Sequence, residues 1–516
     1  MVEATRQRVV LVAASLAVGL AFLDETAVVT ALRAIQADLG MSSPTLQWVM
    51  GAYLLALASW MAAAGRLADL YGRRRIFLIG IGVFALGTFL CVVAPTAFVL
   101  VMGRGVQGVG AALLVPLGYA NATLAVPEDR RGWALGIVST GATVFLAVGP
   151  LVGGLLTQTL GWRWVFGINL LPLLVIAVIA VRWMRESRAD QREPVDILGL
   201  VLLACGLSAL TTALLQVQMS GRAFTAIVLL VSVVALTAFV VVERRSAAPL
   251  VDLRLLRIPA VAGSLAALFA YQFAILGLTV YLTLYLQHVL GYGPAVAGAL
   301  TLPAVVFAPF LSGWVGRRTD ERGTRALTLG ALLLAALSVL VIGLVADARA
   351  VLALMVPLLA FGVARPAATI GGTAGTLGAI RAESRGLASA LATQSRQLGA
   401  VLAVAALGLV VTATEHHTRT ELLHTVDAGF DRADRKALDA LLAGGDDADS
   451  LLAALSPAQR AAALDAAADA YVHGFSVAML VVAAVLLVAS AVGWFLIPRG
   501  KNPRHAGTNR VRRPLG

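Results

Sequence analysis

Apolar runs long enough to cross a bilayer follow one another along the whole chain. A spanning helix needs about 20 consecutive, mostly apolar residues. A spanning backbone must satisfy its own hydrogen bonds, and the chain lacks the alternating pattern of a membrane barrel. The pattern therefore predicts an all-α integral membrane protein with fourteen transmembrane helices, near residues 9–32, 46–65, 76–95, 98–122, 134–156, 164–183, 197–217, 223–242, 260–287, 294–315, 326–346, 350–372, 385–411 and 472–497.

Composition and charge agree with this interpretation. Of the 516 residues 59% are hydrophobic and 13% charged, which excludes a soluble globular protein. The net charge of +12 does not indicate a nucleic-acid partner, because the arginines gather in alternate loops, as at Arg73 to Arg75, Arg182 to Arg192 and Arg244 to Arg257. By the positive-inside rule we expect both termini in the cytoplasm and a multi-pass protein of a bacterial cytoplasmic membrane, with lipid as its surroundings. The basic tail, 499–516, suits contact with anionic lipid.

Three smaller features change little. The first span lacks a cleavage site after its apolar region, so we expect a retained signal anchor. Cys91 and Cys205 fall in predicted spans without metal or redox spacing, and we expect them to pack. The polar segment at about 414–471 contains His416 and His417, but their spacing fits no metal site, and we expect a solvated extracellular cap. We therefore predict no metal.

A polar sequence between the second and third runs recurs in the second part of the chain. Residues 65–75 read G-R-L-A-D-L-Y-G-R-R-R, and Gly65, Arg66, Asp69, Gly72 and Arg74 return at one constant offset as Gly316, Arg317, Asp320, Gly323 and Arg325. R-G-W-A at 131–134 is answered by R-G-L-A at 385–388. Glycine tolerates tight turns and close helix approach, and an aspartate can cap the next helix. The arginines alone also fit a topology signal. Such internal duplication is typical of membrane carriers.

The repeated sequence resembles the signature of the major facilitator superfamily. The resemblance implies two pseudo-symmetric six-helix bundles, here 1–190 and 257–498, and a conformational switch loop made of Gly65, Arg66, Asp69, Gly72, Arg73 and Arg74. The runs within 191–256 have no counterpart in either copy, and they look like the additional central pair of the fourteen-helix drug:proton antiporter branch.

The first run contains two adjacent acids, Asp24 and Glu25. Ionisable groups within a membrane are costly and usually serve an ion or substrate pathway. Neighbours on a helix point about 100° apart, so we expect at most one of them to face a central cavity. L-D-x-T resembles the drug:proton antiporters at Asp24, which favours Asp24 for that position.

R-G-V-Q-G-V-G-A resembles a second family signature, whose arginine, here Arg104, is associated with proton transfer. Asp24 and Arg104 lie at similar depth, about 10–13 Å below the outer surface, and can pair. We predict proton coupling through Asp24, Arg104 and Glu25, with snorkelling as the alternative for the acids.

The fifth run contains Gly141, Gly149, Pro150, Gly153 and Gly154. Small residues four apart and a proline also fit ordinary close helix packing. G-P-x-x-G-G resembles the signature that separates antiporters from symporters, and it implies export.

Several polar residues within predicted spans are candidates for cargo binding. They are Gln107, Tyr271, Gln272, Tyr281 and Tyr285, since aromatic faces bind apolar and cationic compounds, although ordinary packing fits the tyrosines equally. Arg365 and Arg396 are further intramembrane cations, which disfavour highly cationic cargo or indicate an anionic group on it.

These observations together predict proton-coupled efflux of small hydrophobic or amphipathic compounds. We expect the protein to bind protons and a small-molecule substrate, and to use the proton gradient rather than a cofactor. We also expect it to be a monomer. A proton-linked uptake carrier is the alternative. A respiratory proton pump would use intramembrane lysines, but Lys436 and Lys501 lie outside the runs. A membrane enzyme has only the D-x-D of Asp447 and Asp449 in its favour, so we predict no enzyme.

Overall fold

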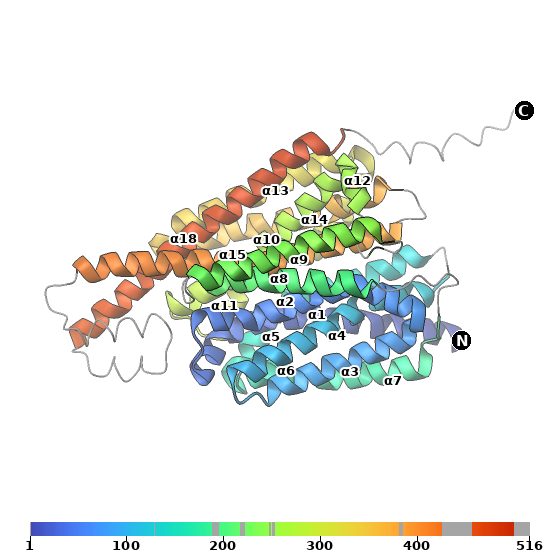
Figure 1. The fold of residues 1–516 in the computed structure, drawn as a ribbon, viewed down its shortest axis with the longest axis horizontal. Helices are drawn as coiled ribbons and strands as arrows, with labels where there is room; N and C mark the ends of the chain where they lie inside the picture. The colour runs from blue at the N-terminus through green and yellow to red at the C-terminus, as the bar shows by residue number, and fades with distance from the viewer. Residues whose placement is uncertain are drawn as a thin grey trace, which may run out of the picture.

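In the computed structural model, residues 2–127, 130–187, 196–216, 222–246, 249, 253–380, 385–425 and 457–499 are described. Every regular element among them is helical, and the helices run roughly along one long axis (Figure 1). The elements are α1 (Val2–Leu39), α2 (Ser43–Tyr71), α3 (Arg73–Val92), α4 (Ala97–Leu124), α5 (Arg131–Thr159), α6 (Arg163–Gly167), α7 (Leu170–Trp183), α8 (Ile197–Gln216), α9 (Arg222–Arg245), η2 (Leu253–Arg257), α10 (Pro259–His288), α11 (Pro294–Thr301), η3 (Leu302–Ala304), α12 (Ala308–Arg322), α13 (Thr324–Val345), η4 (Ala346–Ala348), α14 (Val351–Gly378), α15 (Arg385–Thr425) and α18 (Pro457–Leu496).

Each predicted apolar run coincides with helical structure, so the all-α prediction is confirmed. Two runs are broken: 164–183 is divided into α6 and α7, and 294–315 into α11, η3 and α12. Within the described residues, twelve helical stretches are long and apolar enough to cross a membrane. Neither α2 nor the broken α11 to α12 stretch belongs to this set, so the count of fourteen spans stays a prediction.

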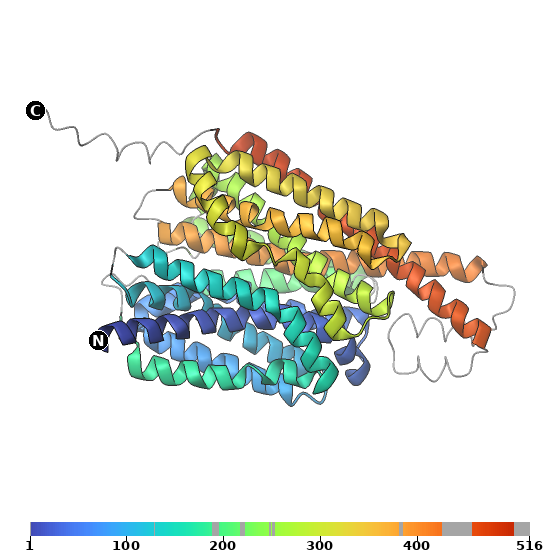
Figure 2. The same ribbon diagram turned by 180° about the vertical axis from the view of Figure 1, so that it is seen from behind.

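The helices form two groups that lie side by side. Helices α1 to α7 make up the first half and α10 to α18 the second, as Figures 1 and 2 show from opposite sides. Helix α8 packs against α9, α2 and α15, so the central pair covers a flank on which both halves meet. The predicted boundaries near 190 and 256 stay predictions.

The two copies of the repeated sequence make the same turn. Gly72 joins α2 to α3 with φ of 107°, and Gly323 joins α12 to α13 with φ of 84°. In each turn the glycine N–H donates to the carbonyl oxygen four residues earlier, at 2.9 Å. Positive φ is readily available only to glycine, which explains why the spacing of both copies keeps one there.

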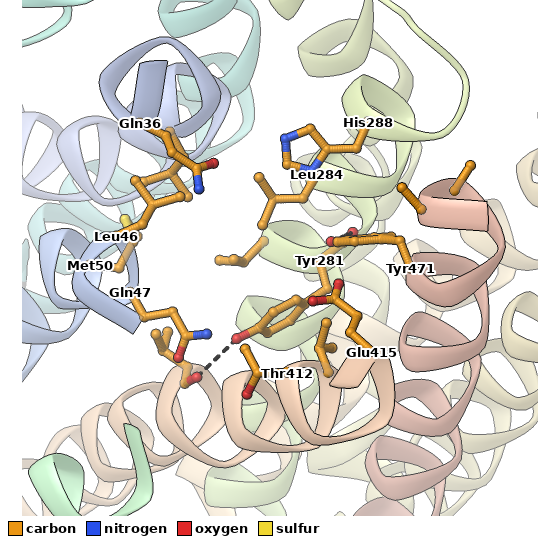
Figure 3. Close-up of a pocket in the computed structure, with 16 residues that line it drawn as sticks. Gln36, Leu46, Gln47, Met50, Tyr281, Leu284, His288, Thr412, Glu415 and Tyr471 are labelled. Carbon is orange, nitrogen blue, oxygen red and sulfur yellow. Dashed lines mark hydrogen bonds between the residues drawn. The ribbon is translucent and has the colours of Figure 1, made fainter. Parts of the chain in front are cut away.

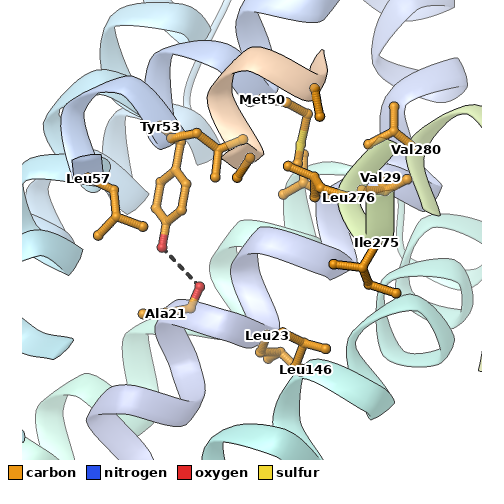
Figure 4. Close-up of a cluster of buried hydrophobic side chains, with 14 of the residues drawn as sticks. Ala21, Leu23, Val29, Met50, Tyr53, Leu57, Leu146, Ile275, Leu276 and Val280 are labelled. Carbon is orange, nitrogen blue, oxygen red and sulfur yellow. Dashed lines mark hydrogen bonds between the residues drawn. The ribbon is translucent and has the colours of Figure 1, made fainter. Parts of the chain in front are cut away.

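We call the end of the bundle with the N-terminus, Arg73 and Arg185 the basic end, and the opposite end the far end. Toward the far end the halves are in contact. Gln287 of α10 donates to the carbonyl oxygen of Thr30 in α1 at 3.1 Å, and Arg33 donates to the carbonyl oxygen of Gln287. Deeper in the bundle, Figure 4 shows an apolar cluster of α10 residues with side chains of α1, α2 and α5, namely Leu23, Val29, Met50, Leu146, Ile275, Leu276 and Val280. These contacts close the far end.

The predicted antiporter helix, α5, packs closely on both sides. A Cβ at Gly149 would overlap Thr26 of α1, and one at Gly153 would overlap the backbone of Ala27. A Cβ at Gly154 would overlap the backbone of Pro294 in α11, across the two halves.

Two further residues of the predicted antiporter helix join the same contacts. The carbonyl oxygen of Pro150 lies against Gly298 of α11, and Gly141 faces Ser15 of α1. The glycines therefore let one helix contact its own half and the other half at once.

We expect Gly153→Leu to lower the stability of the purified protein by about 1–3 kcal/mol, the usual cost of overpacking, because its side chain meets backbone atoms of Ala27. Thermal unfolding in detergent measures this. Gly82→Leu in α3 is the control, since a Cβ there meets no described atom within 4 Å. Equal unfolding temperatures for the two variants would contradict the packing argument.

Candidate functional site

Asp24 lies at the centre of a buried polar network inside the first half. Its Oδ2 forms an ion pair with Nη1 of Arg104 in α4. Its Oδ1 accepts from Nε2 of Gln107 at 2.9 Å and from Nδ2 of Asn169, just before α7, at 3.0 Å. All four side chains are fully buried. The contact between Asp24 and Arg104 that their depths predict is therefore present.

Neighbouring helices hold Arg104 in place. Its Nε donates to the carbonyl oxygen of Val49 in α2 at 2.9 Å, and its guanidinium lies 4.3 Å from the ring centroid of Tyr53. The Tyr53 hydroxyl in turn donates to the carbonyl oxygen of Ala21 at 2.9 Å (Figure 4). A buried charge is tolerable when it is paired and hydrogen-bonded. Asp24 therefore ties α1 to α4 and α7, and Arg104 ties α4 to α2.

The network retains unused hydrogen-bonding capacity. Nη2 of Arg104 and Oδ1 of Asn169 are buried without a hydrogen-bond partner among the described residues. Unmade hydrogen bonds in a buried site are costly. Nη2 of Arg104 can donate to a further acceptor, and Oδ1 of Asn169 can accept from a further donor.

Glu25 faces the other way. The electrostatic attractions on its carboxylate come first from Arg396 and Arg365 of the second half, and only then from Arg104. Its Oε2 is buried without a hydrogen-bond partner in the described residues. The sequence argument favoured Asp24 for the central cavity, but the structure directs Asp24 into its own half and Glu25 toward the other. Among the described residues, Glu25 of the first half is thus a carboxylate that attracts Arg365 and Arg396, through space rather than as a contact ion pair.

A cavity of about 510 Å³ lies between the halves toward the basic end. Helices α1, α4 and α5 line one side, and α12, α14 and α15 the other. Both Arg365 and Arg396 belong to its lining. The halves thus enclose a space toward the basic end and are in contact toward the far end.

A second pocket of about 230 Å³ lies between the halves near the far end (Figure 3). Its polar lining includes Gln36, Gln47, Tyr281, His288 and Glu415. It shares no lining residue with the basic-end cavity.

The predicted cargo residues have different surroundings. The Tyr281 hydroxyl donates to the carbonyl oxygen of Val404 at 3.0 Å while its ring lines the far-end pocket. Tyr271 stacks on Phe361, and Tyr285 stacks on Phe475, each within the second half.

The two predicted glutamine ligands also have protein partners. Gln272 accepts from Nε of Arg396 at 3.4 Å. Gln107 is occupied by Asp24, Arg104 and Thr88. A direct role in cargo binding for any of these residues stays a prediction.

The switch loop is anchored by a residue that the sequence did not reveal. Glu186, after α7, accepts from the backbone N–H groups of Arg74 and Arg75 at 3.1 and 3.2 Å and so caps α3. The backbone N–H of Arg73 donates to the carbonyl oxygen of Ser187 at 2.9 Å. An acid at a helix N-terminus is favourable. The predicted cap, Asp69, and also Arg66 have side chains outside the described part of the structure.

At Gly65 no close helix approach is present, since a Cβ there meets no described atom within 4 Å.

The sequence analysis also missed residues around the ion pair. Asn169, Tyr53 and Thr88 surround the ion pair, and only Asn169 gave a signal, as an amide within the apolar G-I-N-L-L-P.

Comparison with known proteins gives consistent results. The family model of the Major Facilitator Superfamily matches residues 14–404. The multidrug resistance protein Stp of Mycobacterium tuberculosis is 32% identical over 503 residues, 96% of this chain and 92% of that protein. The puromycin resistance protein pur8 of Streptomyces alboniger is 33% identical over 95% of this chain and 90% of its own length. The methylenomycin A resistance protein of Streptomyces coelicolor is 34% identical over 77% of this chain and 84% of its own length.

Solved structures share the fold. A bacterial homolog of the human lysosomal transporter Spinster, in an inward-facing and occupied conformation, superposes with a TM-score of 0.67 at 18% identity, covering 94% of this chain and 96% of that chain. A D-xylose-proton symporter has a TM-score of 0.60 at 13% identity, covering 96% of this chain and 98% of that chain. At these identities the likeness concerns the fold alone.

We expect Arg104→Gln to destabilise the purified protein by about 3 kcal/mol or more, because Asp24 then keeps a buried charge without its cation. The double variant Asp24→Asn/Arg104→Gln should lose less than the sum of the two single losses, since the amides can hydrogen-bond without charge. Thermal unfolding of the four proteins measures the coupling. Additive losses would show that the ion pair does not hold the first half together.

Proposed function

This chain belongs to the major facilitator superfamily, and from that premise we propose that it exports small hydrophobic or amphipathic compounds in exchange for protons. The family and the two-half fold predicted from the Gly65 to Arg75 sequence are confirmed. The chain is therefore a multi-pass membrane transporter, and a transporter binds its small-molecule cargo without converting it.

The direction of transport is inferred from the relatives and from the helix α5. The relatives are named for resistance to drugs or antibiotics, which favours export over uptake. Pro150 and Gly154 contact α11 of the other half, while Gly149 packs against α1 of its own half. If the basic end faces the cytoplasm, as the positive-inside rule requires, this conformation is open on the side from which an exporter loads.

Proton coupling is carried by one observation, the two acids of α1 that face opposite halves. Asp24 is paired with Arg104 and hydrogen-bonded on both oxygens. Glu25 lies within electrostatic range of Arg365 and Arg396, with one oxygen unpaired. A proton on Glu25 removes an attraction between the halves, and a proton on Asp24 removes one within the first half.

The cycle follows from these contacts. Cargo enters the basic-end cavity, and the far-end contacts of Gln287, Thr30 and Arg33 then separate while the basic end closes. Protons that enter from the far end neutralise the acids and favour return. No cofactor is required, because the proton gradient supplies the free energy, and a monomer contains both halves. We assign the protein to the bacterial cytoplasmic membrane with both termini in the cytoplasm.

Inside-out membrane vesicles from an efflux-deficient host test this proposal. We expect vesicles with this protein to accumulate at least one fluorescent compound from a panel of a cation, a neutral compound and an anion (ethidium, Nile red and N-dansyl-phenylalanine) when the interior is acidified, and an uncoupler to abolish the accumulation. Asp24→Asn and Arg104→Ala should reduce the initial rate to that of vesicles without the protein, because the coupling pair is lost.

Asp38→Asn is the matched control. Asp38 lies on the same helix but pairs with Arg163 on an exposed surface, where an ion pair contributes little. Accumulation that survives the uncoupler would refute proton coupling. Accumulation of the same compound in right-side-out vesicles instead would favour the uptake carrier.

A further inference from the structure

We propose that the basic-end cavity is an anion-selective site, in which Arg365 and Arg396 bind the carboxylate of an amphipathic compound. This inference deepens the proposed function, on which it rests, by naming the class of cargo.

The first argument is the charge of the cavity. Two arginines line it, and its described lining contains no acid. Arg365 and Arg396 lie within electrostatic range of each other, and Glu25 is the carboxylate that acts on Arg365. Two positive charges against one negative charge leave a net charge of about +1 when Glu25 is ionised. A buried excess charge is stabilised by a counter-ion. The uncompensated positive charge of the two arginines therefore favours binding of an anion.

The second argument is an unused donor. Arg365 is 8% exposed, and its Nη1 is buried without a hydrogen-bond partner in the described residues. Arg396 donates through Nε to Gln272 at 3.4 Å, which orients its guanidinium. A guanidinium presents a planar set of donors that matches the two oxygens of a carboxylate. Nη1 of Arg365 is thus available to an acceptor that the described residues do not supply.

The third argument is the rest of the lining. Phe22, Leu146 and Leu377 provide apolar surface, and Tyr119 and Thr143 provide hydroxyl groups. The volume of about 510 Å³ falls in the range of sites for drug-sized ligands. Apolar surface beside two arginines suits a molecule with a hydrophobic body and one anionic group, rather than an inorganic ion.

Glu25 gives the site its relation to transport. Its carboxylate and a bound cargo carboxylate compete for the same arginines. Cargo that displaces Glu25 weakens an attraction between α1 and the second half. Binding of an anionic compound and protonation of Glu25 therefore have the same effect on the interface: cargo weakens this attraction on the outward movement, and a proton weakens it on the return.

The test uses two probes that differ in one group, N-dansyl-phenylalanine and its neutral amide, titrated by fluorescence into the purified full chain in detergent. We expect the acid to bind about tenfold more tightly than the amide, the size of one charge-assisted interaction. Arg365→Gln and Arg396→Gln should each remove most of this preference and leave the affinity for the amide within about twofold.

Further variants keep the result interpretable. Arg365→Lys should retain part of the preference, because it keeps the charge but not the planar donors. Glu25→Gln should tighten binding of the acid by removing the competing carboxylate. Arg349→Gln is the control of equal charge change, since Arg349 pairs with Asp469 on an exposed surface remote from the cavity. An unaltered affinity for the amide reports that each variant is folded.

Equal binding of acid and amide to the unmodified protein, or a preference that survives the loss of both arginines, would overturn the proposal. So would competition by phosphatidylglycerol in nanodiscs that disappears in Arg365→Gln, which would assign the site to a lipid headgroup. Acid preference without accumulation of any compound in vesicles would refute export and leave the site standing. Export of ethidium without a preference for the acid would refute the anion-selective site and leave the proposed export standing.

Discussion

The buried ion pair between Asp24 and Arg104 is the interaction on which the first half depends. In a lipid-embedded bundle water cannot stabilise a charge, so each charged group must find its partner within the protein. Asp24 meets this requirement with three donors, two from α4 and one from the residue before α7, and Arg104 with Asp24, a backbone carbonyl and an aromatic face. The positions of α1, α2, α4 and α7 are therefore fixed by polar contacts as well as by apolar packing.

The same constraint explains why the halves attract one another. The second half has two intramembrane arginines in the cavity lining, and the first half supplies the carboxylate of Glu25 opposite them. Close packing of Gly154 against Pro294 and the hydrogen bond from Gln287 to Thr30 hold the far end. The interface thus consists of a packed far end and a charged, open basic end.

The fold follows largely from the sequence, because an apolar run in a bilayer has little choice but to form a helix. The turns at Gly72 and Gly323 could be anticipated from the repeat, since both copies need the same backbone conformation. The breaks between α6 and α7 and between η3 and α12 could not, because the apolar runs continue through them. The pairing of Asp24 with Arg104 was predictable from depth, whereas Asn169 and Glu186 act through the tertiary arrangement of α7 and its flanks. Whether Tyr271 and Tyr285 pack or line a cavity likewise depends on neighbours that their own helix does not specify.

Adjacent acids on one helix acquire separate tasks because successive side chains point in different directions. A rotation of about 100° between Asp24 and Glu25 is enough to direct one into the first half and the other toward the second. A carrier that must couple a proton to a movement of its halves needs a segment in contact with both halves and charged toward each. In the proposed cycle, that segment is the single turn of α1 around Asp24 and Glu25.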